Sequence, residues 1–161
     1  MNIKVGFGFD VHRLKHERPC FLGGVLVSEH DGPEGHSDAD VLIHAICDAL
    51  LGAANLRDIG FHFPNTDERY KNIDSKKLLS EVVLLLKKKN YRIGNVDATV
   101  TLEKPKLNPH IPAMQKVLSA LMNITEEDVS IKATTNELLG YVGRGEGVNA
   151  SAVVLIYRDD H

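Results

Sequence analysis

Apolar and polar residues alternate strictly along residues 5–12, close to the beginning of the chain. Successive side chains of a β-strand point to opposite faces, so this alternation predicts a strand with one apolar and one polar face. We expect the apolar face, which carries two aromatic rings, to pack against the hydrophobic core. The apolar face holds Val5, Phe7, Phe9 and Val11, and the polar face holds Gly6, Gly8, Asp10 and His12.

Three later stretches repeat apolar residues at the three- and four-residue spacing of an amphipathic helix. The first covers residues 41–53. Ser37 is its expected N-cap, and two aspartates follow in the first turn, where negative charge is favoured. The second helix is expected over about residues 75–89 and the third over about residues 109–121.

The remaining apolar stretches predict strands. Residues 21–27 contain a Gly-Gly turn or bulge, and we expect this segment to pair with the first strand in a hairpin. Further strands are expected at residues 96–102, 129–133 and 152–157. Neither a repeat nor a linker divides the chain, so residues 1–161 are expected to form a single α+β domain. The predicted architecture is a mixed four-stranded sheet with helices on one face, plus an N-terminal hairpin.

Composition narrows the class of protein. The 161 residues are 43% hydrophobic, which suits one domain that buries about 70% of the surface of its unfolded chain. A net charge of −3 without a long basic cluster argues against nucleic acid as a partner. Apolar runs stay well short of the roughly 20 residues of a membrane span, so we expect no membrane association. We recognise no signal or transit peptide, and the two cysteines form no disulfide framework, so we expect a cytoplasmic protein.

Metal-binding chemistry is suggested by the polar face of the first strand. Asp10 and His12 lie two residues apart, so both can reach one divalent cation. The alternative is a solvated strand edge on which the two residues have no joint purpose. His44 follows Asp40 by four residues, which suggests a metal-bound imidazole held by a carboxylate behind it; a surface pair that caps the helix is the alternative. Cys47 is either a further ligand or, as we prefer, a core residue.

Motifs spread over nearly the whole chain give a specific resemblance. They stand at residues 10–12, 36–44, 48–54, 58–60, 63–67, 94–97, 132–137 and 143–147. In this order and spacing the chain resembles the family of 2-C-methyl-D-erythritol 2,4-cyclodiphosphate synthases, enzymes of the non-mevalonate isoprenoid pathway. Chance agreement at so many fixed spacings is not credible.

The resemblance implies a metal-dependent active site. The family's zinc ligands fall on Asp10, His12 and His44. Three protein ligands leave a fourth position open, which is the pattern of a catalytic zinc site. A second metal, Mg²⁺ or Mn²⁺, falls on Glu137. The contacts that stabilise the transition state fall on His36 and Thr135.

The resemblance also implies which segments bind the nucleotide substrate. Residues 58–67 suit a polyol, whose hydroxyls need acceptors, although taken alone this loop also reads as a helix cap. Asn65 and Asn136 stand where the family has Asp and Thr. Residues 104–108, with a matching lysine at Lys106, wrap the cytidine in the family and would otherwise read as a plain connection. The implied substrate-binding set is Asp10, Val11, His12, His36, Ser37, Asp58, Ile59, Gly60, Phe63, Pro64, Asn65, Thr66, Asp67, Lys104, Pro105, Lys106, Leu107, Asn108, Ala133, Thr134, Thr135, Asn136, Glu137, Tyr141 and Arg144.

Residues 143–147 alternate glycine with opposite charges. An arginine in such a loop suits a diphosphate, and a flexible surface loop is the alternative. In the family, Arg144 and Glu146 lie at the axis of a homotrimer whose sheets surround the threefold axis. The strands of the sheet are apolar nearly throughout, so the second face of the sheet also needs cover, and such a trimer would supply it. The trimer would also share each active site between neighbouring chains. Whether an isoprenoid diphosphate occupies the trimer cavity stays open.

The implied reaction is an intramolecular phosphoryl transfer by a phosphorus–oxygen lyase. The 2-phosphate of 4-diphosphocytidyl-2-C-methyl-D-erythritol 2-phosphate attacks the β-phosphorus, CMP leaves and the cyclic diphosphate forms. A phosphate dianion is already ionised, so catalysis would depend on positioning and charge neutralisation. Two alternatives stay open: a zinc-dependent phosphohydrolase with His36 or Asp40 as its base, and a non-catalytic, metal-dependent nucleotide-binding protein.

Overall fold

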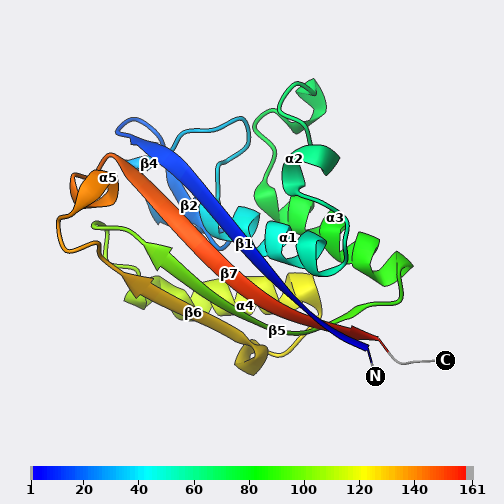
Figure 1. Cartoon of the computed structure of the whole chain (residues 1–161). Coiled ribbons are helices and arrows are strands. Elements are labelled where there is room, and N and C mark those ends of the chain that lie inside the picture. Colours follow the sequence, from blue (N-terminus) through cyan, green and yellow to red (C-terminus); the bar gives the residue numbers. More distant parts are fainter. Residues whose placement is uncertain (1, 159–161) are drawn as a thin grey trace.

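The alternating segment near the N-terminus forms the longest strand of the fold. In the computed structural model, which describes residues 2–158, β1 (Asn2–Lys15) runs antiparallel to β7 (Gly147–Arg158) along most of its length (Figure 1). Beyond β7 lie β5 (Arg92–Thr101) and β6 (Val129–Thr134), which pair in parallel, so the sheet is mixed. The predicted four strands become five, because β4 (Gly32–Pro33) adds a two-residue edge next to β1 and the order is β4-β1-β7-β5-β6.

The predicted hairpin forms between different partners. β2 (Cys20–Leu22) pairs with β3 (Val25–Ser28) in a separate two-stranded sheet. Gly23 and Gly24 reverse the chain between them with φ angles of 59° and 76°, values that glycine adopts without steric cost. The prediction that residues 21–27 pair with the first strand is therefore wrong, because the double glycine divides that segment into its own hairpin.

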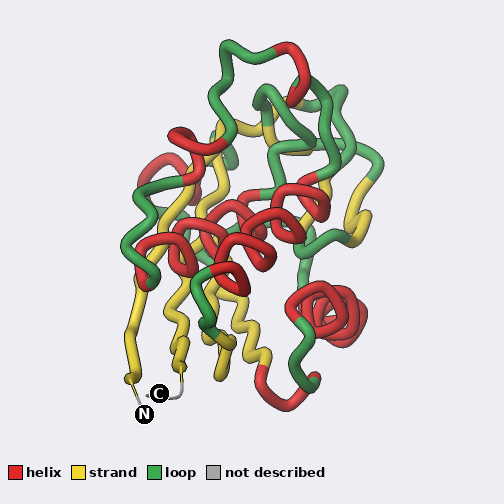
Figure 2. Tube along the Cα trace, turned by 90° about the vertical axis from the view of Figure 1, so that its right-hand side faces the viewer, coloured by secondary structure: helices red, strands yellow, loops and turns green. Residues whose placement is uncertain are grey.

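The three predicted helices cover one face of the sheet (Figure 2). They are α1 (Val41–Ala53), α3 (Ser75–Lys88) and α4 (Ile111–Met122), within one or two residues of the expected bounds. Asp40 caps α1 in place of the predicted Ser37, because its side chain accepts a hydrogen bond from the Ile43 backbone N–H. The short helices α2 (Ile59–His62) and α5 (Gly140–Gly143) and three 3₁₀ turns, η1 (Glu68–Tyr70), η2 (Asn108–His110) and η3 (Glu126–Asp128), complete the fold.

Glycines allow α1 to lie directly on β1. A Cβ atom at Gly6 would lie 1.9 Å from the Ala49 carbonyl oxygen, and one at Gly8 would lie 1.9 Å from the Ala45 carbonyl oxygen. The helix backbone therefore approaches the strand backbone at a distance that no other residue type permits at these two positions. This contact fixes β1 against α1, and so sets the spacing of the side chains that the two elements carry.

The apolar face of β1 is the outer face of the sheet in the single chain. Val5 and Phe7 are 65% and 64% exposed, and Phe9 and Val11 are 46% and 45% exposed. The prediction that this face packs on the core of the chain is wrong. Helix α1 packs on the glycine-bearing face instead, because that face offers room for a helix backbone. A contiguous apolar surface of this kind is typical of an interaction site.

The hydrophobic core lies between the sheet and the helices. Most of its largest fully buried side chains come from α1, α3 and α4, among them Ile46, Leu79 and Leu118, and two come from strands, Leu22 and Ile156. Cys20 and Cys47 are both buried free thiols within this core, which agrees with the preferred interpretation of Cys47 as a core residue. Among residues 2–158, no helix combines the length and apolarity needed to cross a membrane.

Candidate active site

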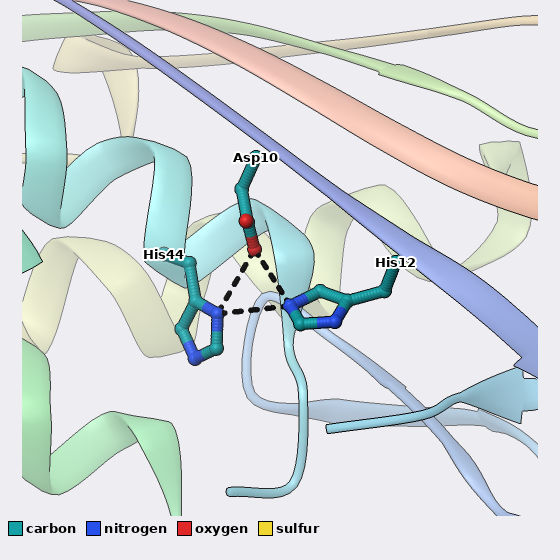
Figure 3. Close-up of side chains that lie close together, drawn as sticks. All are labelled: Asp10, His12 and His44. Carbon is teal, nitrogen blue, oxygen red and sulfur yellow. Dashed lines mark hydrogen bonds and ion pairs between the residues drawn. The ribbon is translucent and has the colours of Figure 1, made fainter. Parts of the chain in front are cut away.

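Three predicted metal ligands meet at one point, where β1 crosses the first turns of α1 (Figure 3). Asp10 and His12 come from the strand and His44 from the helix. The Asp10 Oδ2 atom lies 2.9 Å from His12 Nε2 and 2.9 Å from His44 Nδ1, and the two nitrogen atoms are 3.4 Å apart. Within residues 2–158, these three residues are the only group of His, Cys, Asp and Glu side chains whose ligand atoms converge for a metal ion.

The chemistry of the donor set fits a divalent metal. The Glu34 carbonyl oxygen lies 2.8 Å from His12 Nδ1, and a carbonyl only accepts, so Nδ1 carries the proton and Nε2 offers its lone pair to the group. His44 presents Nδ1 to the same point, while its Nε2 faces two serine hydroxyls. Two imidazole nitrogens and one carboxylate oxygen form a three-ligand set, which leaves a coordination position free.

The three ligands also influence one another's protonation in the metal-free protein. Burial alone would raise the pKa of Asp10, but hydrogen bonds from His12 and His44 outweigh burial and lower this pKa to about 2. Burial alone would lower the pKa of His12, but the hydrogen bond to Asp10 and the Asp10 charge raise it above 6.5. Asp10 is therefore ionised at neutral pH, whereas the raised pKa of His12 means that a metal has to compete with a proton for this imidazole.

Asp40 does not hold the His44 ring, so the prediction of a carboxylate behind the metal at this position is wrong. The Asp40 side chain is fully buried and accepts hydrogen bonds from the backbone N–H groups of Gly23, Gly24 and Ile43 at 3.0, 2.7 and 3.0 Å. These hydrogen bonds cap α1 and join the helix to the glycine turn of the hairpin. Asp40 and His44, four residues apart, are joined through the backbone instead, because the His44 N–H donates a hydrogen bond to the Asp40 carbonyl.

A cavity of about 210 Å³ opens beside the triad. Apart from the triad, six predicted substrate residues line it: His36, Ser37, Ile59, Gly60, Phe63 and Asn65. Four further lining residues were not predicted from the sequence: Gly35, Tyr70, Ile73 and Leu78. Tyr70 packs edge-on against Phe63 with ring centroids 5.4 Å apart, so the two rings form one aromatic wall. Phe63 follows α2 and Tyr70 ends η1, so the two residues share no helix or strand, and no periodicity indicated Tyr70.

Other predicted residues of this region lie outside the cavity lining. Asp67 caps the η1 turn and forms an ion pair with Arg69, with 2.6 Å between Asp67 Oδ2 and Arg69 Nη2. Its carbonyl oxygen lies 3.3 Å from His36 Nε2 and can orient that ring. Asp58 begins α2, and Val11 points to the outer face of the sheet. Pro64 and Thr66 are exposed in the intervening loop.

The predicted cytidine segments lie at the C-terminal ends of β5 and β6. Residues 104–108 follow β5 and residues 133–137 end β6, and neither segment lines the cavity beside the triad. Glu103, which sequence analysis missed, joins the two segments, because its Oε1 atom accepts hydrogen bonds from the backbone N–H groups of Asn136 and Leu138 at 2.9 and 3.3 Å. A lone carboxylate after a strand gave no reason to expect this contact.

The predicted second metal ligand and the residues of the predicted trimer axis are exposed in the single chain. The Thr135 hydroxyl lies 3.2 Å from the Glu137 Oε1 atom, so the predicted catalytic hydroxyl and the predicted magnesium ligand are neighbours. Arg144 pairs with Glu146 at 2.9 and 3.0 Å, and this ion pair raises the pKa of Arg144 and lowers the pKa of Glu146. The Tyr141 hydroxyl accepts a hydrogen bond from Asn149.

Comparison with known proteins gives consistent matches along the chain. The YgbB family model matches residues 3–157. The protein of Cytophaga hutchinsonii named 2-C-methyl-D-erythritol 2,4-cyclodiphosphate synthase is 65% identical over 158 residues, which cover 98% of this chain and 99% of that protein. The protein of the same name from Parabacteroides distasonis is 62% identical over 158 residues, which cover 98% of each chain.

Solved structures show the same fold. A complex named "IspF (Plasmodium falciparum) CDP complex" has a TM-score of 0.87 at 34% identity, and the match covers 99% of this chain and 98% of that one. The bifunctional IspDF of Campylobacter jejuni has a TM-score of 0.95 at 38% identity. The match covers 99% of this chain but 43% of that longer protein.

Proposed function

We infer the activity of this protein from one premise: the chain belongs to the YgbB family. Two relatives named 2-C-methyl-D-erythritol 2,4-cyclodiphosphate synthase are 65% and 62% identical over nearly the whole chain, and structures named for this synthase have been solved with CDP. The chain converts 4-diphosphocytidyl-2-C-methyl-D-erythritol 2-phosphate to 2-C-methyl-D-erythritol 2,4-cyclodiphosphate and CMP in the non-mevalonate pathway to isoprenoid precursors. The observation that carries this conclusion is the triad of Asp10, His12 and His44 beside a cavity lined by predicted substrate residues.

The reaction makes modest demands on side-chain chemistry. The 2-phosphate attacks the β-phosphorus, the bond to the CMP oxygen breaks, and the overall change is that of a phosphorus–oxygen lyase. The nucleophile is already ionised, so the protein has to hold the two phosphates in line and exclude water. His36, positioned beside the cavity by the Asp67 carbonyl, and Thr135 would donate hydrogen bonds to charge that develops in the transition state.

The triad would hold Zn²⁺, and Glu137 would hold Mg²⁺ or Mn²⁺. When bound, these cations neutralise negative charge on the phosphates of the substrate. The support for zinc is the donor set itself, two imidazoles and one carboxylate with a position left free. The support for the second metal is an exposed carboxylate beside the Thr135 hydroxyl, where a hard cation finds oxygen ligands.

The methylerythritol part of the substrate would bind in the cavity beside the triad, whereas the cytidine would bind at residues 104–108 and 133–136. Because the second set does not line that cavity, a second chain would have to bring it there. The exposed apolar face of β1 supports a homotrimer with the sheets around its axis, and in it Arg144 and Glu146 would lie at that axis. A cytoplasmic location stays a prediction, and whether an isoprenoid diphosphate occupies the trimer cavity stays open.

A phosphohydrolase is the nearest alternative, and the product separates the two. Hydrolysis needs a general base beside the triad. Asp40 is excluded as that base because it is fully buried and both its oxygen atoms accept backbone hydrogen bonds, which leaves His36. We expect purified protein with zinc and magnesium to release CMP and one cyclic diphosphate, as measured by mass analysis of the second product. A linear methylerythritol phosphate would establish the hydrolase, and binding without CMP release would establish a nucleotide-binding protein.

Zinc affinity should fall as the pH falls through the raised pKa of His12. Below this pKa the His12 ring of the metal-free protein carries a second proton, on Nε2, and zinc has to displace it. The loss of zinc affinity should therefore begin above pH 6.5. Each imidazole that has to lose a proton contributes roughly a tenfold loss of affinity per pH unit. Asp10 adds nothing until far lower pH, because its pKa is about 2. Competition with a chelator measures the affinity, and a value that stays flat from neutral pH to about pH 4 would contradict the ligand set.

A further inference from the structure

The His44 ring is connected to a carboxylate that the metal triad does not include. His44 Nε2, the nitrogen that points away from Asp10, lies 3.0 Å from the Ser75 hydroxyl oxygen. That hydroxyl donates in turn to Asp38 Oδ1. The second oxygen atom of Asp38 accepts the Ser75 backbone N–H at 3.0 Å, so Asp38 also fixes the position of the serine at the first residue of α3. Ser75 is fully buried, so its hydroxyl does not reach water.

The hydrogen bonds from His44 through Ser75 to Asp38 determine which ring nitrogen of His44 carries the proton. An ionised carboxylate only accepts, so the single proton of the Ser75 hydroxyl points at Asp38. The oxygen atom of Ser75 therefore turns a lone pair toward His44 Nε2, and a second lone pair on that nitrogen 3.0 Å away would be repelled. Nε2 then carries the ring proton, and Nδ1 keeps its lone pair directed at the triad.

A second hydroxyl near the ring does not reverse this assignment. Ser37 Oγ lies 3.2 Å from His44 Nε2 and accepts the Ala39 backbone N–H at 3.0 Å. Its own proton has no carboxylate to hold it, so it can turn away from Nε2 and leave a lone pair facing the ring proton. Ser37 is thus compatible with either tautomer, whereas Ser75 is compatible with one.

We propose that Asp38 and Ser75 are positioning residues that hold His44 in the tautomer with a free lone pair on Nδ1, and so set the affinity of the site for its metal. This inference rests on the metal site of the proposed function and not on the reaction. Without Asp38 and Ser75, a neutral His44 could carry its ring proton on Nδ1 and donate a hydrogen bond to Asp10, whose Oδ2 atom lies 2.9 Å away. Asp10 and His44, two of the three metal ligands, would then be hydrogen-bonded to each other instead of being free to bind the metal.

The tautomer of His12 is fixed in a different way, because the Glu34 carbonyl accepts the Nδ1 proton. A backbone carbonyl needs no further orientation, because it only accepts. A serine hydroxyl can donate or accept, so Ser75 requires Asp38 to decide its direction. This explains why a carboxylate lies behind the serine at His44 and none is needed at His12.

The test compares Ser75→Ala with Ser80→Ala, using zinc alone as the probe. Both serines lie on α3, but the Ser80 hydroxyl donates to the Lys76 carbonyl within the helix and does not contact the triad. We expect the dissociation constant for zinc to rise about 10- to 100-fold in Ser75→Ala and to stay unchanged in Ser80→Ala. Asp38→Ala, which leaves the Ser75 hydroxyl free to turn, should weaken zinc binding in the same direction.

Nitrogen-15 NMR of the histidine rings reads the tautomer directly. In the metal-free wild-type protein at alkaline pH we expect the His44 proton on Nε2, and in metal-free Ser75→Ala at the same pH we expect a population with the proton on Nδ1. Wild-type affinity in Ser75→Ala, or a wild-type His44 with its proton on Nδ1, would overturn the proposal. The wild-type spectrum decides even if a variant does not fold. Because no substrate is used, failure of the proposed reaction would leave this result intact.

Discussion

His44→Ala should lose its stoichiometric zinc and lower kcat/KM by about a thousandfold or more. The variant keeps Asp10 and His12, which both come from β1, but loses the ligand that α1 contributes. A metal that neutralises phosphate charge supplies several kcal/mol of transition-state stabilisation, and each 1.4 kcal/mol corresponds to a factor of about ten in rate. The loss of zinc and the loss of activity should therefore occur together.

The fold should survive this substitution. Alanine is the best helix former, and His44 lies at the edge of the core rather than inside it, with 12% of its side chain exposed. Metal content, CMP release and circular dichroism measure the three effects. His16→Ala is the matched control, because His16 is an exposed histidine that pairs with Asp31 and does not belong to the triad. A purified His44→Ala protein with one zinc per chain would show that the ligand assignment is wrong.

The metal ligands could be predicted from the sequence because each depends on a local pattern or a motif. Asp10 and His12 share a face of any strand, since side chains on a strand repeat every two residues. The resemblance added His44. The carboxylate behind His44 could not be predicted in the same way, because Ser75 lies 31 residues from His44 and 37 from Asp38. The nearer candidate, Asp40, had the right helical spacing, but it caps α1 and anchors a hairpin turn.

The face of the first strand that meets the helices was predicted incorrectly for a similar reason. Hydrophobic alternation predicts two faces but not which of them meets the helices. The deciding feature is the pair Gly6 and Gly8, where the backbone of α1 occupies the space that side chains would need. The apolar residues then face outward in the single chain, and Phe7 is 64% exposed. The pattern therefore agrees with the burial that β1 would have in the proposed trimer, which the sequence of one chain does not separate from burial in its own core.

Two inactive variants should restore activity when they form trimers together. In the proposed trimer each site combines the triad of one chain with the cytidine segments, residues 104–108 and 133–136, of its neighbour. The first variant is His44→Ala, which damages the triad. The second is Lys106→Glu, which reverses a charge in the first cytidine segment, at an exposed side chain whose change leaves the core intact. Neither variant alone can form a complete site.

The expected yield follows from the geometry of a ring of three chains. Random assembly of equal amounts gives mixed trimers about three-quarters of the time, and each mixed ring has one interface that joins an intact triad to an intact cytidine segment. About a quarter of all sites should therefore be restored. The experiment is to unfold the two variants, refold them together and measure CMP release against each variant refolded alone.

Two controls make the outcome decisive. Each variant has to be trimeric on its own, which sedimentation measures, and differently tagged chains have to be recovered in one complex after joint refolding. With both conditions met, recovery near a quarter of wild-type activity supports a site shared between chains. A site contained within one chain would give no recovery, since every chain in the mixture carries a defect. That outcome would mean that residues 104–108 reach the triad of their own chain by a rearrangement, because they do not line its cavity here.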